Sequence, residues 1–339
     1  MNSNLSCCRE KIVSYDNLDK KISRLKPCEK CEDISIKKFT PLKDEIDFNL
    51  LHNDYKRCEC GKRPLDIVMA HILRIMIEEN IAPTDATLRK DTPTFLPTVF
   101  YSPNNSQFMS YDSIILIHSD FDEKIAKRLF KEIGEVRGVL KGDPEETVGI
   151  LDKNHDAKVY TLLYGCDIRS DILNTFIKHD NSLEKIIINK KQSKNNIEVG
   201  STTEAKLFKL YKYLKNNKNL KDNAFNLKVI DATCGVGAIG IFLLKYGFSE
   251  VIFNDIYCGA IKTCLENLKT NGFKFEKTQD VEKIAIGDNF KVYNSSFEDL
   301  SDKFEEDYFD LCVIDCFTNV DSSELEKKAN KIAKNVLLI

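Results

Sequence analysis

The chain has 339 residues, enough for two or three domains and for a full hydrophobic core. Apolar residues make up 42% and charged residues 30%, which is typical of globular proteins and excludes disordered or fibrous ones. No apolar run reaches the ~18 residues that a membrane-spanning helix needs, and the first residues lack the apolar core of a secretory signal. The sequence therefore predicts a cytoplasmic protein without a membrane segment, whose 12 cysteines are reduced thiols.

The net charge of −3 hides an uneven distribution along the chain. Residues 178–228 carry 12 basic and 5 acidic side chains, whereas residues 229–339 carry 12 basic and 19 acidic ones. A basic block of this kind can bind nucleic acid, and it can equally form a solvated helix face and a linker. Both interpretations remain open from the sequence alone.

Residues 1–97 are expected to form an irregular module with two cysteine pairs. The pairs are Cys28-x-x-Cys31 and Cys58-x-Cys60. Four thiolates suit tetrahedral zinc, which would order a segment with little hydrophobic core. Free thiols and an iron–sulfur cluster are the alternatives to zinc, and His52 could replace one ligand.

Three basic residues flank the second cysteine pair, namely Arg57, Lys62 and Arg63. They would suit RNA binding, and they would also suit a purely structural knuckle. A helix is expected over residues 65–79, where apolar residues recur at helical spacing. On its apolar face, His71 is expected to be a core histidine.

Residues 98–195 alternate strand-like and helix-like segments and predict an α+β domain, for which substrate binding is the expected role. Strands are expected over residues 113–118, 147–151, 159–164 and 183–189, and helices over residues 122–133 and 167–179. A polar linker over residues 191–200 follows. The next predicted helix, residues 203–215, has one apolar face for docking. Its lysines, spread over the opposite half, are Lys206, Lys209, Lys212 and Lys215.

From residue 228 the segments alternate regularly between strands and helices. Strands are expected over residues 229–231, 251–253, 291–294, 311–314 and 336–339, and helices over residues 236–246, 257–271 and 323–334. This alternation predicts an α/β fold with a doubly wound parallel sheet, in a domain covering residues 200–339.

The strongest motif lies at the first strand-to-helix turn of this domain. It reads Asp231-Ala-Thr-Cys-Gly235-Val-Gly237-Ala-Ile-Gly240. Glycines at such a turn let the backbone approach a nucleotide, and an acidic residue at the end of the next strand, here Asp255, binds ribose hydroxyls. The pattern fits S-adenosylmethionine or a dinucleotide, and a glycine-rich turn without a ligand is the third interpretation. Asp231 favours S-adenosylmethionine, because a carboxylate suits its cationic amino-acid end and opposes a pyrophosphate.

This motif, together with F-N-D-I-Y-C-G-A-I-K-T-C-L-E-N-L-K-T-N-G over residues 253–272, resembles class I S-adenosylmethionine-dependent methyltransferases. The resemblance covers about residues 200–320 and is greatest to the tRNA guanine methyltransferases of archaea and eukaryotes. It implies a Rossmann-like domain with a shortened class I sheet, because the chain stops where the fifth of seven strands is expected. The sheet would then be short, or completed by another part of the chain or by a partner.

The resemblance also implies roles for individual residues. The methionine part would be lined by Asp231, Gly235 and Gly237, the ribose held by Asp255, and the adenine flanked by Ser295 and Ser296. At the end of the fourth strand, Asp315 would accept a proton or hydrogen bond from the methyl acceptor. Phe317 would stack on a planar substrate, with core packing as the alternative. A covalent role for Cys316 is a further alternative.

The predicted function is that of an S-adenosylmethionine-dependent methyltransferase. The expected substrate is a base in RNA, with tRNA favoured, methylated by direct in-line transfer. A methyltransferase acting on a protein or a small metabolite, a non-catalytic S-adenosylmethionine-binding protein and a nicotinamide-dependent oxidoreductase are the alternatives. Whether the protein forms a homo-oligomer stays open.

Overall fold

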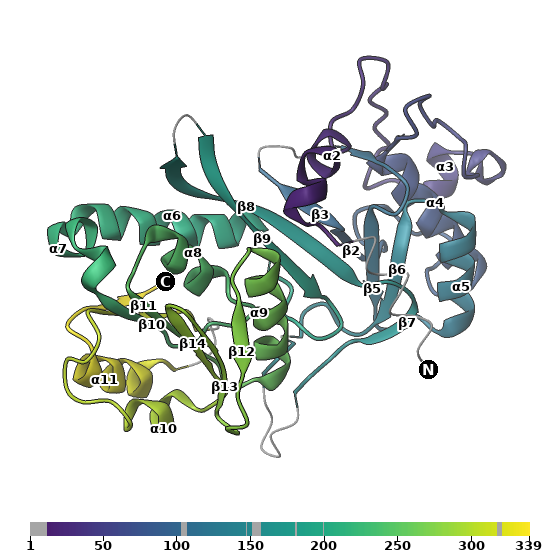
Figure 1. Cartoon of the computed structure of the whole chain (residues 1–339). Helices are drawn as coiled ribbons and strands as arrows, with labels where there is room; N and C mark the ends of the chain where they lie inside the picture. Colours follow the sequence, from purple (N-terminus) through teal and green to yellow (C-terminus); the bar gives the residue numbers. More distant parts are fainter. Residues whose placement is uncertain are drawn as a thin grey trace. The chain divides into compact units, whose positions relative to one another are not determined.

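The computed structural model describes residues 12–102, 107–146, 148–150, 157–179, 182–198, 200–316 and 321–339. The chain forms two compact units (Figure 1). The first comprises Met1–Val148, Lys158–Ser170 and Lys191–Ile197, and the second comprises Gly149–Ala157, Asp171–Lys190 and Glu198–Ile339. The three-domain organisation with boundaries at residues 97 and 195 remains a prediction. None of the helices in the described ranges is long and apolar enough to cross a membrane.

The first unit contains a four-stranded sheet and two longer helices. Its helices are η1 (Tyr15–Asn17), α2 (Leu18–Ser23), α3 (Leu42–Glu45), η2 (Phe48–Leu50), α4 (Leu65–Glu78) and α5 (Glu123–Glu132). Its strands are β1 (Arg63–Pro64), β2 (Thr94–Pro97), β3 (Val99–Tyr101), β4 (Phe108–Met109), β5 (Ile114–His118), β6 (Val136–Lys141) and β7 (Thr161–Gly165). The sheet order is β2-β5-β6-β7, in which β5 and β6 are parallel. A core of buried apolar side chains, including Ile72, Leu116 and Leu129, joins α4 and α5 to the sheet.

Several predicted elements of this unit are confirmed. The predicted helices over residues 65–79 and 122–133 are α4 and α5, and the strand over 113–118 is β5. Asp122 starts α5 by accepting a hydrogen bond from the Ile125 N–H at 2.9 Å.

The helix predicted over residues 167–179 is wrong, because this segment is strand β8 (Ile168–His179). It pairs with β9 (Ser182–Lys191), the strand predicted over 183–189. Consecutive residues 167–173 are all buried, so both faces of the strand are covered, which hides the two-residue period. Of the strand predicted over 147–151, residues 147 and 151 lie outside the described residues and 148–150 form no strand.

The second unit contains a seven-stranded sheet flanked by helices. Its helices are α6 (Gly200–Asn216), α7 (Lys218–Asp222), η3 (Ala224–Asn226), α8 (Ala238–Tyr246), α9 (Cys258–Thr270), α10 (Phe297–Ser301) and α11 (Ser323–Ile332). The strands of this sheet are β10 (Lys228–Asp231), β11 (Glu250–Asn254), β12 (Phe275–Lys277), β13 (Lys283–Gly287), β14 (Phe290–Tyr293), β15 (Leu311–Ile314) and β16 (Val336–Leu338). The sheet order is β12-β13-β14-β11-β10-β15-β16.

The five neighbouring strands β14, β11, β10, β15 and β16 are parallel, which confirms the predicted Rossmann-like sheet. Buried side chains of α10 and α11, such as Phe297 and Ile332, pack on one face of the sheet in the same hydrophobic cluster as Ile230. On the other face α8 packs against β10 and β11 (Figure 1). The crossovers therefore cover both faces, as a doubly wound sheet requires.

The two edges of this sheet are built differently. The sequence did not predict β12 and β13, which form an antiparallel hairpin on the outer side of β14. At the opposite edge lies β16, whose only partner among the described strands is β15. Here the ammonium group of Lys209 donates a hydrogen bond to the Leu338 carbonyl at 2.9 Å.

Candidate functional site

Three carboxylates lie at the carboxyl ends of neighbouring parallel strands in the second unit. Asp231 ends β10, Asp255 follows β11 and Asp315 follows β15. The strand order reverses between β10 and β15, and in open α/β sheets ligands bind at the carboxyl ends of the strands at this switch point. The structure thus gathers three of the predicted site residues where the fold places a ligand.

Asp231 is fully buried, and the described residues engage only one of its carboxylate oxygens. Its Oδ2 accepts the Gly240 N–H at 2.8 Å, which fastens the first turn of α8 to the end of β10. Its Oδ1 has no hydrogen-bond partner among the described residues. Burial raises the pKa of Asp231 well above its usual range, and the negative charge of Asp315 raises it further. A cationic ligand group, bound directly or through water, would relieve both conditions.

The glycines of the motif serve different purposes. Gly235 has a φ of +52°, and a Cβ there would meet no atom of the described residues within 4 Å, which leaves room for a ligand beside it. Gly237 has a φ of +94°, and its Cβ would lie 2.7 Å from the Sγ of Cys264. At Gly240 a Cβ would lie 2.1 Å from the ring of Phe253 in β11, so this glycine permits close packing of helix on strand. Only Gly235 therefore faces open space.

Asp255 is held against the glycine turn. One carboxylate oxygen accepts the Gly235 N–H and the other accepts the Tyr257 N–H, each at 2.8 Å. The Asn294 side chain, at the end of β14, donates to the carbonyls of Asp255 and Ile256 at 2.8 and 2.9 Å. Burial raises the pKa of Asp255. Each oxygen keeps a lone pair, so a fixed carboxylate is available for hydroxyl donors such as those of a ribose.

The predicted adenine contacts Ser295 and Ser296 lie in the turn between β14 and α10. The hydroxyl of Ser296 accepts the Asp299 N–H at 3.1 Å and caps α10, whereas Ser295 is half-buried. Near them Ile256, which follows Asp255, exposes 50% of its surface and offers an apolar face that the sequence analysis did not single out. The contact of the two serines with adenine remains a prediction.

Asp315 forms an ion pair that the sequence did not reveal. The Nζ of Lys206 on α6 lies 2.7 Å from its Oδ2 and 2.5 Å from Oε1 of Glu198. Burial raises the pKa of Asp315, and Lys206 partly opposes this shift. Although burial lowers the pKa of Lys206, Glu198 and Asp315 together raise it. Lys206 therefore stays protonated and orients the carboxylate of Asp315.

The backbone after β15 is tied to the turn after β10. The Thr233 hydroxyl accepts the Asp315 N–H at 2.8 Å and lies 3.1 Å from the Asp315 carbonyl, to which it donates. Burial raises the pKa of Cys316 and keeps its thiol neutral, which disfavours the covalent role considered for it. Phe317 lies outside the described residues, so its role remains a prediction.

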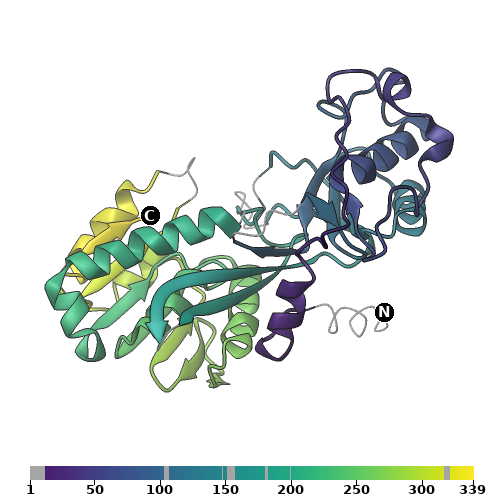
Figure 2. The ribbon, with the colours of Figure 1, turned by 90° about the horizontal axis from the view of Figure 1, so that it is seen from above.

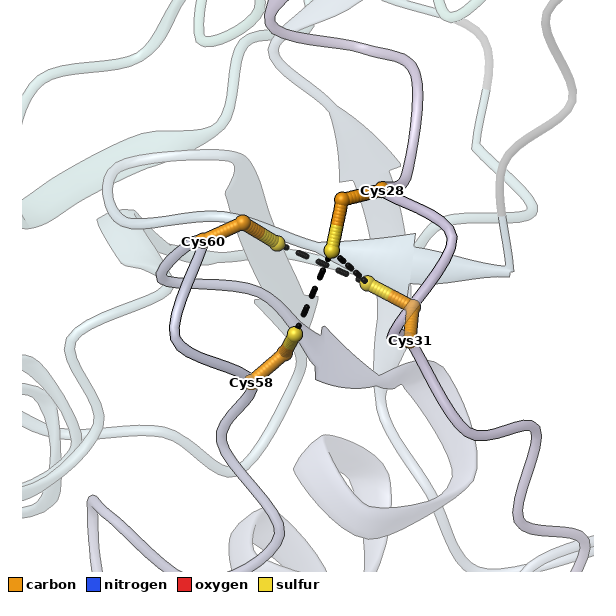
Figure 3. Close-up of side chains that lie close together, drawn as sticks. All are labelled: Cys28, Cys31, Cys58 and Cys60. Carbon is orange, nitrogen blue, oxygen red and sulfur yellow. Dashed lines mark hydrogen bonds between the residues drawn. The ribbon is translucent and has the colours of Figure 1, made fainter.

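Four cysteines of the first unit, Cys28, Cys31, Cys58 and Cys60, gather in one place (Figure 3). Their Sγ atoms all lie within 4.8 Å of one another. Cys28 and Cys31 come from one turn, in which the Cys31 N–H donates to the Cys28 carbonyl at 3.1 Å. Cys58 and Cys60 come from a second turn, closed by a hydrogen bond from Gly61 N–H to the Cys58 carbonyl at 2.8 Å. Two such knuckles with converging thiols could hold a metal ion, and four thiols are a donor set that suits tetrahedral zinc; His52 is not part of the group.

The basic residues beside this cluster are structural. The guanidinium groups of Arg57 and Arg63 lie 2.8 and 2.6 Å from the carboxylate of Glu135, whose side chain is fully buried. Lys62 exposes only 7% of its surface. These side chains are therefore withdrawn from solvent and do not form an RNA-binding surface. His71 is buried as expected, and burial lowers its pKa to about 3.

No protein-family model and no curated protein matches the sequence. Among solved structures, P. horikoshii TYW2 in complex with MeSAdo is 18% identical, with 78% of this chain and 76% of that chain covered and a TM-score of 0.40. The M. jannaschii tRNA m1G37 methyltransferase is 14% identical over 77% and 62% of the two chains, with a TM-score of 0.39. The structure of aTrm5 in complex with tRNALeu is 15% identical, with 65% of this chain and 54% of that chain covered and a TM-score of 0.38.

The strand order of the second unit defines its fold. In that order, and in the position of its glycine turn and acidic residues, the second unit resembles class I S-adenosylmethionine-dependent methyltransferases, as the sequence predicts. The site contacts missed by the sequence analysis involve Lys206, Asn294 and Thr233. Their partners lie 109, 39 and 82 residues away along the chain, so no local pattern could indicate them.

Proposed function

We propose that the protein is an S-adenosylmethionine-dependent methyltransferase that acts on RNA, with tRNA as the favoured substrate. The observation that carries this proposal is the Oδ1 of the buried Asp231, at the switch point of the sheet, which has no hydrogen-bond partner in the described part of the chain. A buried carboxylate oxygen without a donor suits a ligand that brings its own cation. A dinucleotide pyrophosphate would instead bring further negative charge to a site with three carboxylates.

Each described site residue has a role that fits this cofactor. Asp231 would hold the ammonium end of the methionine, Gly235 would leave room for the ligand, and Asp255 would bind the ribose hydroxyls. The bound cofactor supplies an electrophilic methyl group. Asp315, oriented by Lys206, would bind the acceptor group and take up the proton that it releases. With its pKa raised, Asp315 is a stronger base than an ordinary aspartate.

The charge distribution supports RNA as the substrate. The basic block of residues 178–228 includes β9 and the whole of α6, and it borders an acidic domain. A polyanion would be attracted to this block and repelled by the remainder of the second unit. A protein or small-metabolite substrate would not require such a segregation of charge.

We also propose that Cys28, Cys31, Cys58 and Cys60 bind one zinc ion in a structural site. All four positions of a tetrahedral site are filled by thiols, which leaves no open position for a catalytic water. Because zinc binds thiolates and not disulfides, the proposal requires a reducing compartment such as the cytoplasm.

Calorimetric titration tests the cofactor directly. We expect S-adenosylmethionine to bind and NAD to show no binding. Asp255→Asn should weaken the binding of S-adenosylmethionine, because an amide cannot accept from both backbone N–H groups and from the ribose. The Asp288→Asn variant is the matched control, since Asp288 lies in the turn between β13 and β14. Binding of NAD in place of S-adenosylmethionine would contradict the proposal.

A second experiment identifies the class of acceptor. Cell extract is separated into RNA, protein and small-molecule fractions, and each is incubated with the protein and methyl-labelled S-adenosylmethionine. Label in the RNA fraction is the expected result. Label in another fraction would retain the enzyme and refute the RNA substrate, and label in none would favour a non-catalytic binding protein.

A further inference from the structure

We propose that a stripe of aromatic and lysine side chains on α6 and β8 binds unpaired bases of the RNA substrate. The stripe consists of Phe176, Phe208, Tyr211, Lys212 and Lys215. The inference rests on the proposed RNA substrate and adds to it the surface that holds the strand. All five residues belong to the second unit.

Four of the five residues share one face of α6. Phe208, Tyr211, Lys212 and Lys215 are spaced three and four residues apart, so they form one line along the helix. The Nζ of Lys212 lies 4.4 Å from the ring centroid of Phe208, and that of Lys215 lies 5.5 Å from the ring centroid of Tyr211. Phe208 is 40% exposed, although a phenylalanine with a purely structural role is usually buried.

Phe176 joins this line from β8, which lies beside α6 (Figure 2). Its ring centroid is 4.9 Å from that of Phe208 and 6.1 Å from that of Tyr211. Its φ is +64°, a conformation that costs a residue with a side chain about 1 kcal/mol. Next to it, Glu204 of α6 accepts the Asn174 backbone N–H at 2.8 Å and fixes the strand to the helix. A strained backbone thus aims an aromatic ring at the stripe.

The chemistry of the stripe fits a single-stranded nucleic acid. Every base has a π-face that can stack on an exposed ring, and lysines next to the rings can pair with the phosphates. Lys178, on the same strand as Phe176, is also exposed. An acidic peptide would use the lysines and gain little from the rings, so the combination favours RNA.

The stripe is separate from the proposed cofactor site and from the core. Lys206, which pairs with Asp315, is two residues from Phe208 and therefore projects from the opposite side of the helix. The core contacts of α6 come from Leu207, Leu210 and Leu214, each fully buried. Substitutions in the stripe should therefore leave folding and cofactor binding intact.

The test measures binding of a fluorescent oligouridine RNA by anisotropy as a function of salt. Phe208→Ala should weaken binding about tenfold, the loss expected for one stacked base. The double variant Lys212→Gln, Lys215→Gln should lower the slope of log affinity against log salt by about 1.4, since each phosphate contact contributes about 0.7. The charge-matched control is Lys274→Gln, Lys277→Gln, which removes two exposed lysines elsewhere in the unit and should leave the slope unchanged.

Further controls separate this proposal from its alternatives. Phe225→Ala removes another exposed aromatic ring of the same unit and should not affect RNA binding. Unchanged RNA affinity in both stripe variants would overturn the proposal. It would also be overturned if the protein bound polyglutamate as tightly as RNA and Phe208→Ala left that binding unchanged. Methyl transfer to RNA is measured on the same samples. If the stripe variants bind and methylate RNA as the wild type does, the RNA-binding role of the stripe is refuted and the proposed function stands. If the wild-type protein methylates no RNA, the proposed substrate is refuted.

Discussion

Replacing Asp231 by asparagine should separate the stability of the protein from its ability to bind the cofactor. The asparagine side chain has the same shape, and its oxygen can still accept the Gly240 N–H that Asp231 accepts at 2.8 Å. What it lacks is the negative charge and the acceptor at the position of the unpartnered Oδ1. We therefore expect a folded protein that binds S-adenosylmethionine poorly.

The contacts of Asp231 give the expected magnitudes. A hydrogen bond to a charged group contributes about 1.5–3 kcal/mol, so Asp231→Asn should weaken cofactor binding by roughly 10- to 150-fold. The free energy of unfolding should stay within about 1 kcal/mol of the wild type, because the Gly240 contact remains. Asp231→Ala leaves that buried N–H unpaired and should lower the free energy of unfolding by about 1–3 kcal/mol.

The raised pKa of Asp231 adds a pH dependence with a defined sign. A carboxyl whose pKa is higher in the folded than in the unfolded state binds its proton more tightly when folded, so its contribution to stability falls as pH rises from the unfolded to the folded pKa. Asp231→Asn removes this loss, and its stability relative to the wild type should therefore increase over that window. Wild-type affinity for the cofactor should rise with pH over the same window, because the ligand's cation requires the ionised carboxylate.

Calorimetric titration with S-adenosylmethionine and urea unfolding at several pH values measure both quantities for the wild type, Asp231→Asn and Asp231→Ala. Wild-type affinity in Asp231→Asn would refute the role assigned to the carboxylate. A loss of stability in Asp231→Asn as large as that in Asp231→Ala would show that the Gly240 contact is not what connects Asp231 to α8.

Three further predictions concern packing, metal and charge. Gly240→Ala places a methyl group 2.1 Å from the ring of Phe253, and thermal unfolding should show a loss of about 1–3 kcal/mol. The purified protein should contain one zinc per chain by elemental analysis, and the Cys31→Ser variant should lose the zinc and melt at a lower temperature. The same substitution at the exposed Cys258 is the control and should retain the zinc. A visible absorption band would indicate an iron–sulfur cluster in place of zinc. Glu135→Gln removes the carboxylate that lies 2.6 Å from the buried guanidinium group of Arg63 and the nearer of the two carboxylates beside Arg57. It should cost about 3–5 kcal/mol in urea unfolding, and a loss below about 1 kcal/mol would contradict the buried ion pair.

The parts of the fold that the sequence predicts well are those determined by local pattern. The strands and helices of the second unit follow from short apolar runs separated by glycines such as Gly247 and Gly272, both of which have positive φ in the structure. The spacing from Gly235 to Asp255 likewise predicts a carboxylate beside the glycine turn, and the hydrogen bond between them confirms that proximity. Such features depend on neighbours in the sequence.

The parts that the sequence did not predict depend on distant partners. β8 carries buried polar side chains, and Asp171 is compatible with burial because Lys190 of β9 lies 2.9 Å away. Without that pairing the segment shows Ile168, Ile172 and Phe176 at a spacing of four, which is typical of a helix. The ion pair of Lys206 is equally non-local, since its partner Asp315 is 109 residues away.

The most direct test of the proposed function is methyl transfer to RNA followed by nuclease digestion. Wild-type protein is incubated with methyl-labelled S-adenosylmethionine and tRNA from cells that lack the gene, with Asp231→Asn as the matched variant. The proposed function predicts one labelled modified nucleoside with the wild type and at least a tenfold smaller yield with the variant at a limiting cofactor concentration. Equal labelling by both proteins, or no labelled nucleoside from an active cofactor-binding preparation, would contradict it.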